Sequence, residues 1–523
     1  MFDRRTSRST GLAVTGAVVL ALAGVGPAAA AAPAPVRAAA PVPARYAEQQ
    51  LAWQPCAQAP SLECAAMTVP MDWHHPDGGR DITVEVSRHQ ATDPAQRRGV
   101  LMMAAGGPGG SGLTRPAQFV RYSGAVAAAY DVVGFDQRGV GQSTPARCQS
   151  DAEFQDFFAG DFRDRSPAAV QGVLDRSRQL ATGCLQQTGD LLPYLNTDQT
   201  VHDMDLFRSL LGAPKISYYG PSYATMIGAY YATEFPQRVE RVVLDSNIEF
   251  TSSWQTDLAW EPMSFQRRFE QDFLPWVAQY DSVYHLGATT AEAKATWERL
   301  RQSLTDHPVT IGSAVIAPNQ LDNGAILAMY NAGQGFEPLA TALAALEHWA
   351  DATPAERQTV SQVFLSYLSP GFTAEFFAVT CNDTPWTRSE RYWVRRSGQD
   401  AAAYPLMGAR ELAFATVCAD WPVAPAPHIK VTGAGLPTVL MLNSVHDPAT
   451  AYEGAVQAHQ QLRGSRLVTV TGGGDHVQYQ NHNACVDAIV DRYLLTGTAP
   501  AHDTSCAANP LPVPPAAAGT ATG

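Results

Sequence analysis

The stretch from Lys215 to Ala232, KISYYGPSYATMIGAYYA, constrains the fold more than any other part of the chain. A short β-prone run leads into Gly220-Pro221-Ser222-Tyr223-Ala224, and a segment of small and apolar residues typical of a helix follows at once. A strand that turns directly into a helix lifts a serine at the turn clear of the sheet and leaves free backbone N–H groups beside it. The pattern predicts a nucleophilic serine at position 222.

Small residues are needed two positions before and two positions after such a serine, because the helix packs closely on neighbouring strands. Gly220 meets this requirement, whereas Ala224 adds one methyl group where the pattern usually ends in glycine. A buried serine in an ordinary strand-to-helix turn is therefore the alternative that this stretch alone leaves open.

The segments around this stretch have the patterns of alternating strands and helices. Residues 196–212 have apolar positions at helical spacing and a terminal glycine, which predicts an amphipathic helix before the serine strand. Residues 52–79 are rich in turn-forming residues. We expect an alternating strand at 80–90 and buried strands at 99–105, 130–136, 241–247 and 436–447. This order predicts a mainly parallel α/β sheet.

The predicted strand 99–105 ends in the glycine-rich run GGPGGSG, residues 106–112. So many glycines after a core strand require a sharp turn or a close approach of the backbone to another group. A phosphate-binding loop would need a following Lys-Ser or Lys-Thr, which this run lacks. We therefore expect an oxyanion hole in which the backbone N–H groups of Gly107 and Tyr223 bind a developing negative charge.

Two more polar residues stand at predicted strand ends downstream of Ser222. Asp447 closes the run 436–447, and His476 follows the strand SRLVTVTG. Serine, acid and histidine in this order are typical of α/β-hydrolase triads, in which the histidine takes the serine proton and the acid orients the imidazole. His446 and His482 are nearby alternatives, which we expect to be structural.

Composition and charge exclude other classes of function. The chain of 523 residues has a net charge of −13 and no basic stripe, which argues against a nucleic-acid partner. Cysteine and histidine do not occur at metal-ligand spacing, so we expect no metal and no other cofactor.

Arginines at 4, 5 and 8 precede an apolar run too short to span a bilayer, which predicts an export signal. We expect a secreted, extracellular monomer that leaves the membrane once the signal is removed.

The eight cysteines fit an exported chain, because disulfides persist in oxidising compartments. An even count permits four bridges, although eight cysteines allow 105 pairings. We expect sequence neighbours to pair in short loops: Cys56 with Cys64, Cys148 with Cys184, Cys381 with Cys418, and Cys485 with Cys506.

The region between the strands 241–247 and 436–447 has many aromatic residues, several amphipathic stretches and few candidate strands, which predicts a mostly helical insertion. The expected organisation is a signal and Ala/Pro-rich segment at 1–39, a first core part at 40–249, a helical cap at 250–430, a second core part at 431–506 and a disordered tail at 507–523.

Five motifs together resemble the secreted tripeptidyl aminopeptidases of actinomycetes, which are serine exopeptidases of the proline iminopeptidase group. The motifs are AAGGPGGSG, YDVVGFDQRGVGQSTPARC, YYGPSYATMIG, AVTCNDTPW and LPTVLMLNSVHDPAT, and the resemblance runs from about Cys56 to Cys506. It implies an α/β-hydrolase core with a helical cap, and removal of short peptides from the free N-termini of peptides or proteins. By position it carries the nucleophile to Ser222, the acid to Asp447 and the base to His476.

Two departures from the family pattern suggest a divergent subgroup, one that releases tripeptides or tetrapeptides after proline. Ala104-Ala105 stand where the family usually has Asn-Pro, and Ala224 stands where it has glycine. A fold alone does not fix a reaction, so an esterase or lipase and a proline iminopeptidase are alternatives. A non-catalytic binding protein of the same fold is a further one.

An aminopeptidase needs a partner for the cationic amine of its substrate, because an unpaired buried charge is very costly. The insertion offers four carboxylates, Glu249 and Glu261 near its start and Glu375 and Asp383 near its end. Each could instead be an ordinary surface carboxylate. We expect at least one of them to bind the substrate N-terminus.

Overall fold

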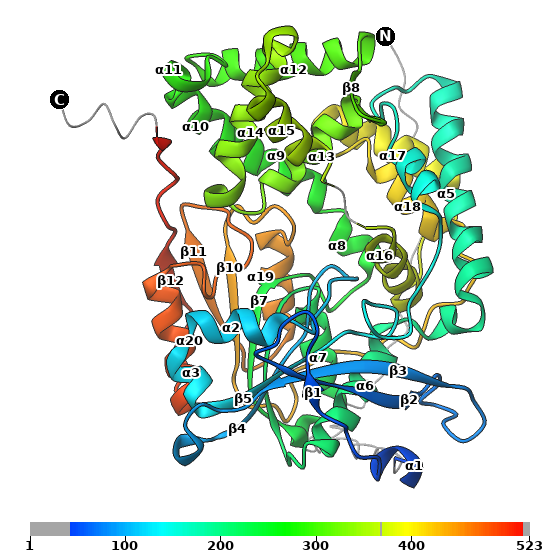
Figure 1. Ribbon diagram of the computed structural model, residues 1–523, viewed down its shortest axis with the longest axis vertical. Helices are drawn as coiled ribbons and strands as arrows, with labels where there is room; N and C mark the ends of the chain where they lie inside the picture. The colour runs from blue at the N-terminus through cyan, green and yellow to red at the C-terminus, as the bar shows by residue number, and fades with distance from the viewer. Residues whose placement is uncertain (1–41, 367–368, 516–523) are drawn as a thin grey trace, which may run out of the picture. The chain divides into compact units, whose positions relative to one another are not determined.

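The computed structural model describes residues 42–366 and 369–515, so the expected export segment at 1–39 lies outside the described residues. One sheet, shown in Figure 1, has the strand order β1-β2-β3-β5-β4-β6-β7-β10-β11-β12. Its strands are β1 (Gln54–Pro55), β2 (Glu63–Pro70), β3 (Asp81–His89), β4 (Gly99–Met103), β5 (Tyr130–Phe135), β6 (Ile216–Ser222), β7 (Val239–Asn247), β10 (Val439–Ser444), β11 (Arg466–Thr471) and β12 (Thr504–Ala507).

Neighbouring strands are parallel from β5 through to β12, and only the edge formed by β1, β2, β3 and β5 is antiparallel. The prediction of a mainly parallel sheet is therefore confirmed. β2 lies in the stretch that we expected to form turns, although its buried residues Ala65, Met67 and Val69 alternate as a strand requires. The serine strand β6 lies between β4 and β7, well inside the sheet.

Helices cover both faces of the sheet because side chains alternate along each strand. On β4, Leu101 and Met103 pack into one apolar cluster, whereas Val100 and Met102 pack into another on the opposite face. The first face is covered by α2 (Arg115–Tyr122), α3 (Gly124–Ala129) and α20 (Ala484–Thr496), and the second by α6 (Thr197–Leu210), α7 (Ala224–Glu234) and α19 (Tyr452–Gln461) (Figure 1).

Other helices lie before β6. They are α1 (Ala44–Ala47), α4 (Asp151–Phe157) and α5 (Pro167–Thr188), with short 3₁₀ turns at Pro94–Gln96 and Gly189–Tyr194; a further 3₁₀ turn at Pro236–Arg238 precedes β7. Helix α6 begins where the sequence predicted, because the Asn196 side chain accepts a hydrogen bond from the Gln199 N–H at 2.9 Å and caps the helix.

The chain between β7 and β10 is mostly helical, as expected for the insertion. Its elements are α8 (Trp254–Leu258), α9 (Glu261–Arg268), a π-helical turn (Phe269–Phe273), α10 (Leu274–Gln279), α11 (Asp281–Tyr284), α12 (Thr290–Asp306), the hairpin β8 (Val309–Ile311) and β9 (Ala314–Ile316), α13 (Pro318–Ala328), α14 (Ala332–Glu347), a 3₁₀ turn (Trp349–Asp351), α15 (Pro354–Phe364), α16 (Pro370–Asp383), α17 (Glu390–Ala403) and α18 (Glu411–Ala419). Helices α9 to α15 share an apolar cluster of their own, whereas α16 to α18 join the cluster on the sheet.

The expectation of a disordered tail from residue 507 is wrong for residues 507–515. Ala507 completes β12, the Ala508 N–H donates to the Thr471 carbonyl at 2.8 Å, and the Trp276 indole N–H donates to the Pro512 carbonyl at 2.8 Å. The composition of this stretch suggested disorder, but its backbone groups find hydrogen-bond partners on β11 and α10. Residues 516–523 lie outside the described residues.

The eight cysteines form the disulfides that the sequence order suggested: Cys56–Cys64, Cys148–Cys184, Cys381–Cys418 and Cys485–Cys506. The bridges close loops with sequence separations of 8, 36, 37 and 21 residues respectively. On the chain-entropy argument, a longer closed loop restrains the unfolded chain more and stabilises the fold more.

We expect alkylation of the denatured, unreduced protein to add no label, and reduction to expose eight thiols, as a mass spectrum would show. Replacing Cys148 and Cys184 by alanine should lower the free energy of unfolding by about 4 kcal/mol, against about 2.5 kcal/mol for the shorter Cys56–Cys64 loop. Urea denaturation measures both. Two or more labelled cysteines before reduction would contradict the pairing.

Candidate active site

Ser222 stands on the sharp turn that the sequence predicted between β6 and α7. Its backbone φ is 60°, a left-handed conformation that residues other than glycine rarely adopt. Such a conformation costs about 1–3 kcal/mol and persists only where the surrounding structure enforces it. The turn brings the Ser222 side chain to the wall of a cavity at the carboxyl ends of the parallel strands.

Close packing beneath the turn explains why glycine stands at positions 220 and 228. A Cβ on Gly220 would lie 2.6 Å from the Ala224 carbonyl oxygen, and a Cβ on Gly228 would lie 2.4 Å from the Tyr218 ring. The Tyr218 hydroxyl donates to that same Ala224 carbonyl at 2.7 Å. Gly228, one turn further along α7, therefore provides the close helix–strand approach, and the methyl group of Ala224 is accommodated in the buried turn.

His476 and Asp447 are paired at the neighbouring strand ends. Nδ1 of His476 lies 2.9 Å from Oδ1 and 3.1 Å from Oδ2 of Asp447, and the aspartate side chain is completely buried. The Asp447 carboxylate also accepts the backbone N–H groups of Ala449 and Thr450 at 3.1 and 2.9 Å. These bonds fix the carboxylate and leave Nε2 of the imidazole to face the serine.

The two alternative histidines are placed elsewhere. Nδ1 of His446 lies 3.0 Å from the Asp272 carboxylate, and the ring of His482 meets the edge of Tyr122 with centroids 6.0 Å apart. Neither forms part of the cavity wall that contains Ser222, whereas His476 does.

Asp245, at the end of β7, holds the loop that follows His476, and sequence reasoning missed it. Its carboxylate accepts the backbone N–H groups of Gln478 and Tyr479, both at 2.9 Å, and the Tyr219 hydroxyl at 3.0 Å. Burial raises the pKa of Asp245 to about 6, although these hydrogen bonds oppose the shift. The signal was present, because Asp245 is an acid at a buried strand end, as Asp447 is.

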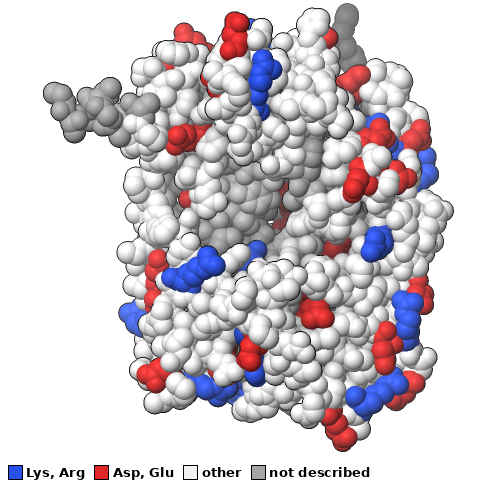
Figure 2. All heavy atoms as spheres, in the orientation of Figure 1, with Lys and Arg blue, Asp and Glu red and all other residues white. Residues whose placement is uncertain are grey.

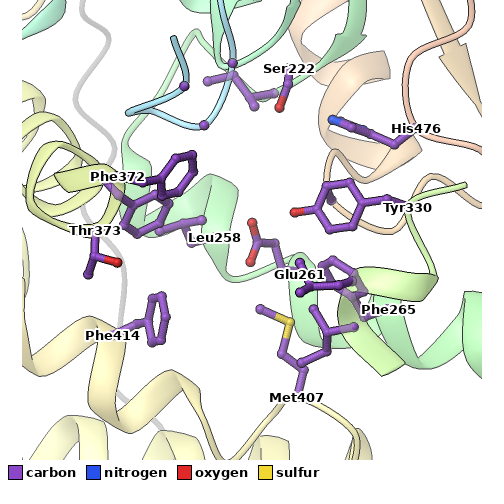
Figure 3. Close-up of a pocket in the computed structure, with 18 of the residues that line it drawn as sticks. Ser222, Leu258, Glu261, Phe265, Tyr330, Phe372, Thr373, Met407, Phe414 and His476 are labelled. Atoms are coloured by element: carbon purple, nitrogen blue, oxygen red, sulfur yellow. The ribbon is translucent and has the colours of Figure 1, made fainter. Parts of the chain in front are cut away.

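Ser222 and His476 border one cavity of about 390 Å³, a volume typical of ligand sites. The molecular surface is hollowed below the inserted helices (Figure 2). In Figure 3, the Ser222 hydroxyl and the His476 ring face each other, the Glu261 carboxylate and the Tyr330 hydroxyl point into the cavity, and Met407 lies beyond them. Most of the wall is apolar or aromatic: Phe154, Phe158, Pro221, Ile248, Trp254, Leu258, Phe265, Ile326, Leu327, Tyr330, Phe372, Phe376, Met407, Phe414, Ala449 and Val477.

The glycine-rich loop after β4 passes directly beside Ser222. A Cβ on Gly106 would lie 2.8 Å from the Ser222 Cβ, and a Cβ on Gly107 would lie 3.0 Å from the Phe372 ring. Asp136, at the end of β5, holds the far side of the loop by accepting the N–H groups of Gly112 and Leu113 at 3.0 and 3.1 Å. The loop and the first turn of α7, where Tyr223 stands, therefore converge on the serine.

Of the four carboxylates expected to bind an amine, the structure brings only Glu261 to the cavity. Glu249 is buried and accepts hydrogen bonds from Thr251 and Ser252. Asp383 is buried and bonded to Thr197 and Trp254. Glu375 is buried against Gly139, away from the cavity, and burial raises its pKa well above the ordinary value. Glu249 and Asp383 therefore support the fold through these hydrogen bonds.

Asp257 joins Glu261 in the cavity wall, four residues earlier in the chain, and sequence reasoning did not single it out. Burial raises the pKa of Glu261 to about 8, with Asp257 adding to the shift and Arg410 opposing it. Burial also raises the pKa of Asp257 to about 7. The Glu261 carboxylate forms no salt bridge with any described residue, although the charge of Arg410 acts on it from the same cavity wall. The cavity therefore holds two acidic side chains, Asp257 and Glu261, together with the arginines Arg115 and Arg410.

Serine, aspartate and histidine at the carboxyl ends of β6, β10 and β11 follow the arrangement of α/β hydrolases. The protein is a hydrolase of this fold. Comparison with known proteins narrows the class: residues 404–506 match the family model described as TAP-like protein. The chain is 35% identical over 494 residues to the tripeptidyl aminopeptidase of Streptomyces lividans, covering 90% of this chain and 88% of the relative. It belongs to this TAP-like family of α/β hydrolases.

Two further relatives have names that differ in the substrate they suggest. The chain is 29% identical to the serine protease Hip1 of Mycobacterium tuberculosis (strain H37Rv), covering 88% of this chain and 91% of that protein. It is 30% identical to carboxylesterase B of the same strain, covering 88% of this chain and 90% of that protein.

We expect Ser222→Ala, Asp447→Ala and His476→Ala each to fold and to lose nearly all hydrolytic activity, because each removes one member of a single unit. Residual binding and oxyanion effects leave roughly 1,000-fold catalysis over water in such variants. His482→Ala is the matched control. Turnover of chromogenic substrates measures all four variants, and a dead His482→Ala beside an active His476→Ala would reverse the assignment.

Proposed function

We propose that the protein is an exported serine exopeptidase that releases short peptides, of three or four residues, from free N-termini. One observation carries the proposal: the cavity that contains Ser222 and His476 also contains the Glu261 carboxylate, which forms no salt bridge with any described residue even though Arg410 lines the same wall. A carboxylate in a mostly apolar cavity binds a cationic amine strongly, because the charge of each compensates for the loss of water around the other.

In the reaction, His476 takes the proton of the Ser222 hydroxyl as the oxygen attacks the carbonyl carbon of the scissile peptide bond. Asp447 holds the ring and stabilises its cationic form. The N–H groups of Gly107 and Tyr223 bind the oxyanion, and loss of one such donor typically costs a factor of about 100–1,000 in rate. His476 then protonates the departing amine, the C–N bond breaks, and a water molecule activated by His476 releases the peptide from the acyl-enzyme.

The cavity also supports a choice of substrate. Its wall is mainly aromatic and aliphatic, so the residues removed should carry apolar side chains, proline included. The distance from the amine site at Glu261 to Ser222 would set how many residues are released.

An esterase is the second candidate, favoured by the apolar wall and by the similarity to carboxylesterase B. Parallel assays with a tripeptide anilide and a short-chain ester separate the two. Faster hydrolysis of the peptide, with dependence on its free amine, supports the peptidase. Ester hydrolysis alone supports the alternative.

Export is part of the proposal and rests on the N-terminal sequence pattern and on the four disulfides. Across residues 42–366 and 369–515, none of the helices combines the length and apolarity needed to cross a bilayer.

We expect Glu261→Gln to lower kcat/KM for a free tripeptide substrate by about 10–100-fold, because a hydrogen bond to a charged group contributes about 1.5–3 kcal/mol. N-acetylation of the substrate should cause a similar loss, and the two losses should not add. Glu298→Gln, at an exposed ion pair with Arg163, is the control. Equal cleavage of free and acetylated peptides, or cuts in the middle of long chains, would contradict exopeptidase action.

The raised pKa values predict how peptide binding depends on pH. Below about pH 8 the Glu261 carboxyl is largely protonated, so binding a cationic amine must release a proton and becomes tighter as pH rises. Above the amine pKa of about 7.7–8.0 the cation is lost and the trend reverses. KM for a free peptide should therefore fall from pH 6 to 8. The fall should disappear in Glu261→Gln; an unchanged profile in that variant would exclude Glu261 as the ligand.

A further inference from the structure

Arg268, at the end of α9, is completely buried, and all three of its guanidinium nitrogens have partners. Nη1 donates to the Asp272 carboxylate at 2.5 Å, Nη2 donates to the Asp475 carboxylate at 2.5 Å, and Nε donates to the Met329 carbonyl at 3.3 Å. One side chain of the insertion therefore binds two carboxylates, one of which belongs to the insertion and the other to the loop after β11.

Each of the two carboxylates bound by Arg268 is connected to one member of the His476–Asp447 pair, either through the chain or through a contact. Asp475 directly precedes His476 in the chain. Asp272 binds Nδ1 of His446 at 3.0 Å, and His446 directly precedes Asp447. The His446 N–H also donates to the Gly473 carbonyl at 3.1 Å. Arg268 thus connects the two loops that carry the base and the acid.

The π-helical turn at 269–273 follows Arg268 directly and contains Asp272. Such turns are rare and occur frequently at functional sites. Asp272 contacts both Arg268 and His446, and these contacts outweigh burial and hold the pKa of Asp272 below its ordinary value. Its carboxylate therefore remains ionised, and the link to Arg268 intact, at neutral pH.

Further contacts from the insertion bind the same loop. The Asp475 carboxylate accepts the Ala332 N–H at 2.9 Å, and the His476 N–H donates to the Tyr330 carbonyl at 2.7 Å. There is no spare space, since a Cβ on Gly474 would lie 2.8 Å from Cδ of Arg268. The insertion therefore binds the loop that carries His476 directly, through hydrogen bonds to Asp475 and to the His476 N–H.

We propose that Arg268 is a positioning residue that keeps the His476–Asp447 pair aligned with Ser222 by tying both loops to the insertion. The inference rests on the triad of the proposed function. Buried ion pairs often add little to stability compared with apolar residues of similar volume, so a charge held here is better explained by the geometry it imposes. Helix α9 begins at Glu261 and ends at Arg268, so one helix carries both the proposed amine ligand and the positioning residue.

The test compares Arg268→Met with Arg301→Met. Arg301 is also buried in the insertion and bridges two carboxylates, Asp322 and Asp161, but it has no bond to either catalytic loop. The readouts are the rate at which a fluorophosphonate labels Ser222, and kcat and KM for a tripeptide anilide. Circular dichroism and the Tm establish folding.

We expect the fluorophosphonate to label Ser222 at least 10-fold more slowly in Arg268→Met than in the wild type. The kcat of this variant should fall by a similar factor, and its KM should change less than 3-fold. Arg301→Met should lower the Tm but keep labelling and kcat within 2-fold of wild type. Arg268→Lys should recover part of the loss, because it restores the charge but not the fork that reaches both carboxylates. If Arg268→Met does not fold, Asp475→Asn replaces it and should also label at least 10-fold more slowly.

The outcomes are distinguishable. Wild-type protein that fluorophosphonate does not label would refute the serine triad itself. Folded Arg268→Met or Asp475→Asn that labels at the wild-type rate would overturn the positioning role while leaving the triad intact. An equal loss in Arg301→Met would also overturn it, because the effect would then reflect the stability of the insertion in general.

Discussion

The left-handed backbone at Ser222 is the constraint on which the whole site depends. It is enforced from below, where Gly220 and Gly228 let helix α7 and strand β6 approach closely, and from above, where the loop at Gly106 leaves no space. Because packing on both sides fixes the turn, the hydroxyl is oriented before any substrate arrives. Orientation that folding has already imposed does not have to be recovered during the reaction. The rest of the molecule then has to bring His476 to this fixed point.

The residues at strand ends could be predicted from the sequence, because parallel strands deliver their last residues to one edge of the sheet. This rule placed Asp447 and His476 near Ser222 with no knowledge of the loops. It applies equally to Asp245, yet the function of that acid depends on which loop crosses it. Only the structure shows that Asp245 binds the backbone at Gln478 rather than the imidazole.

Residues of the helical insertion could not be ranked from the sequence in the same way. The sequence does not distinguish the four candidate carboxylates, Glu249, Glu261, Glu375 and Asp383. Helix packing decides which of them are buried away from the cavity and which face it. Arg268 has no motif either, because Asp272 is close to it in sequence but its other carboxylate partner, Asp475, lies 207 residues away in the chain. Helices pack by the shapes of their surfaces rather than by hydrogen-bond register, so their contacts leave a weaker pattern in the sequence than strands do.

The end of the chain has a consequence for the order of events during folding. Residues after the last cysteine bind β11 through the Ala508 N–H and α10 through the Pro512 carbonyl, which accepts the indole N–H of Trp276. Trp276 belongs to the apolar cluster of the insertion, so the insertion lacks this hydrogen bond until the segment around Pro512 is in place. Domains generally fold from the N-terminus as the chain emerges. In this protein, the insertion therefore depends on a segment that lies 236 residues downstream of Trp276.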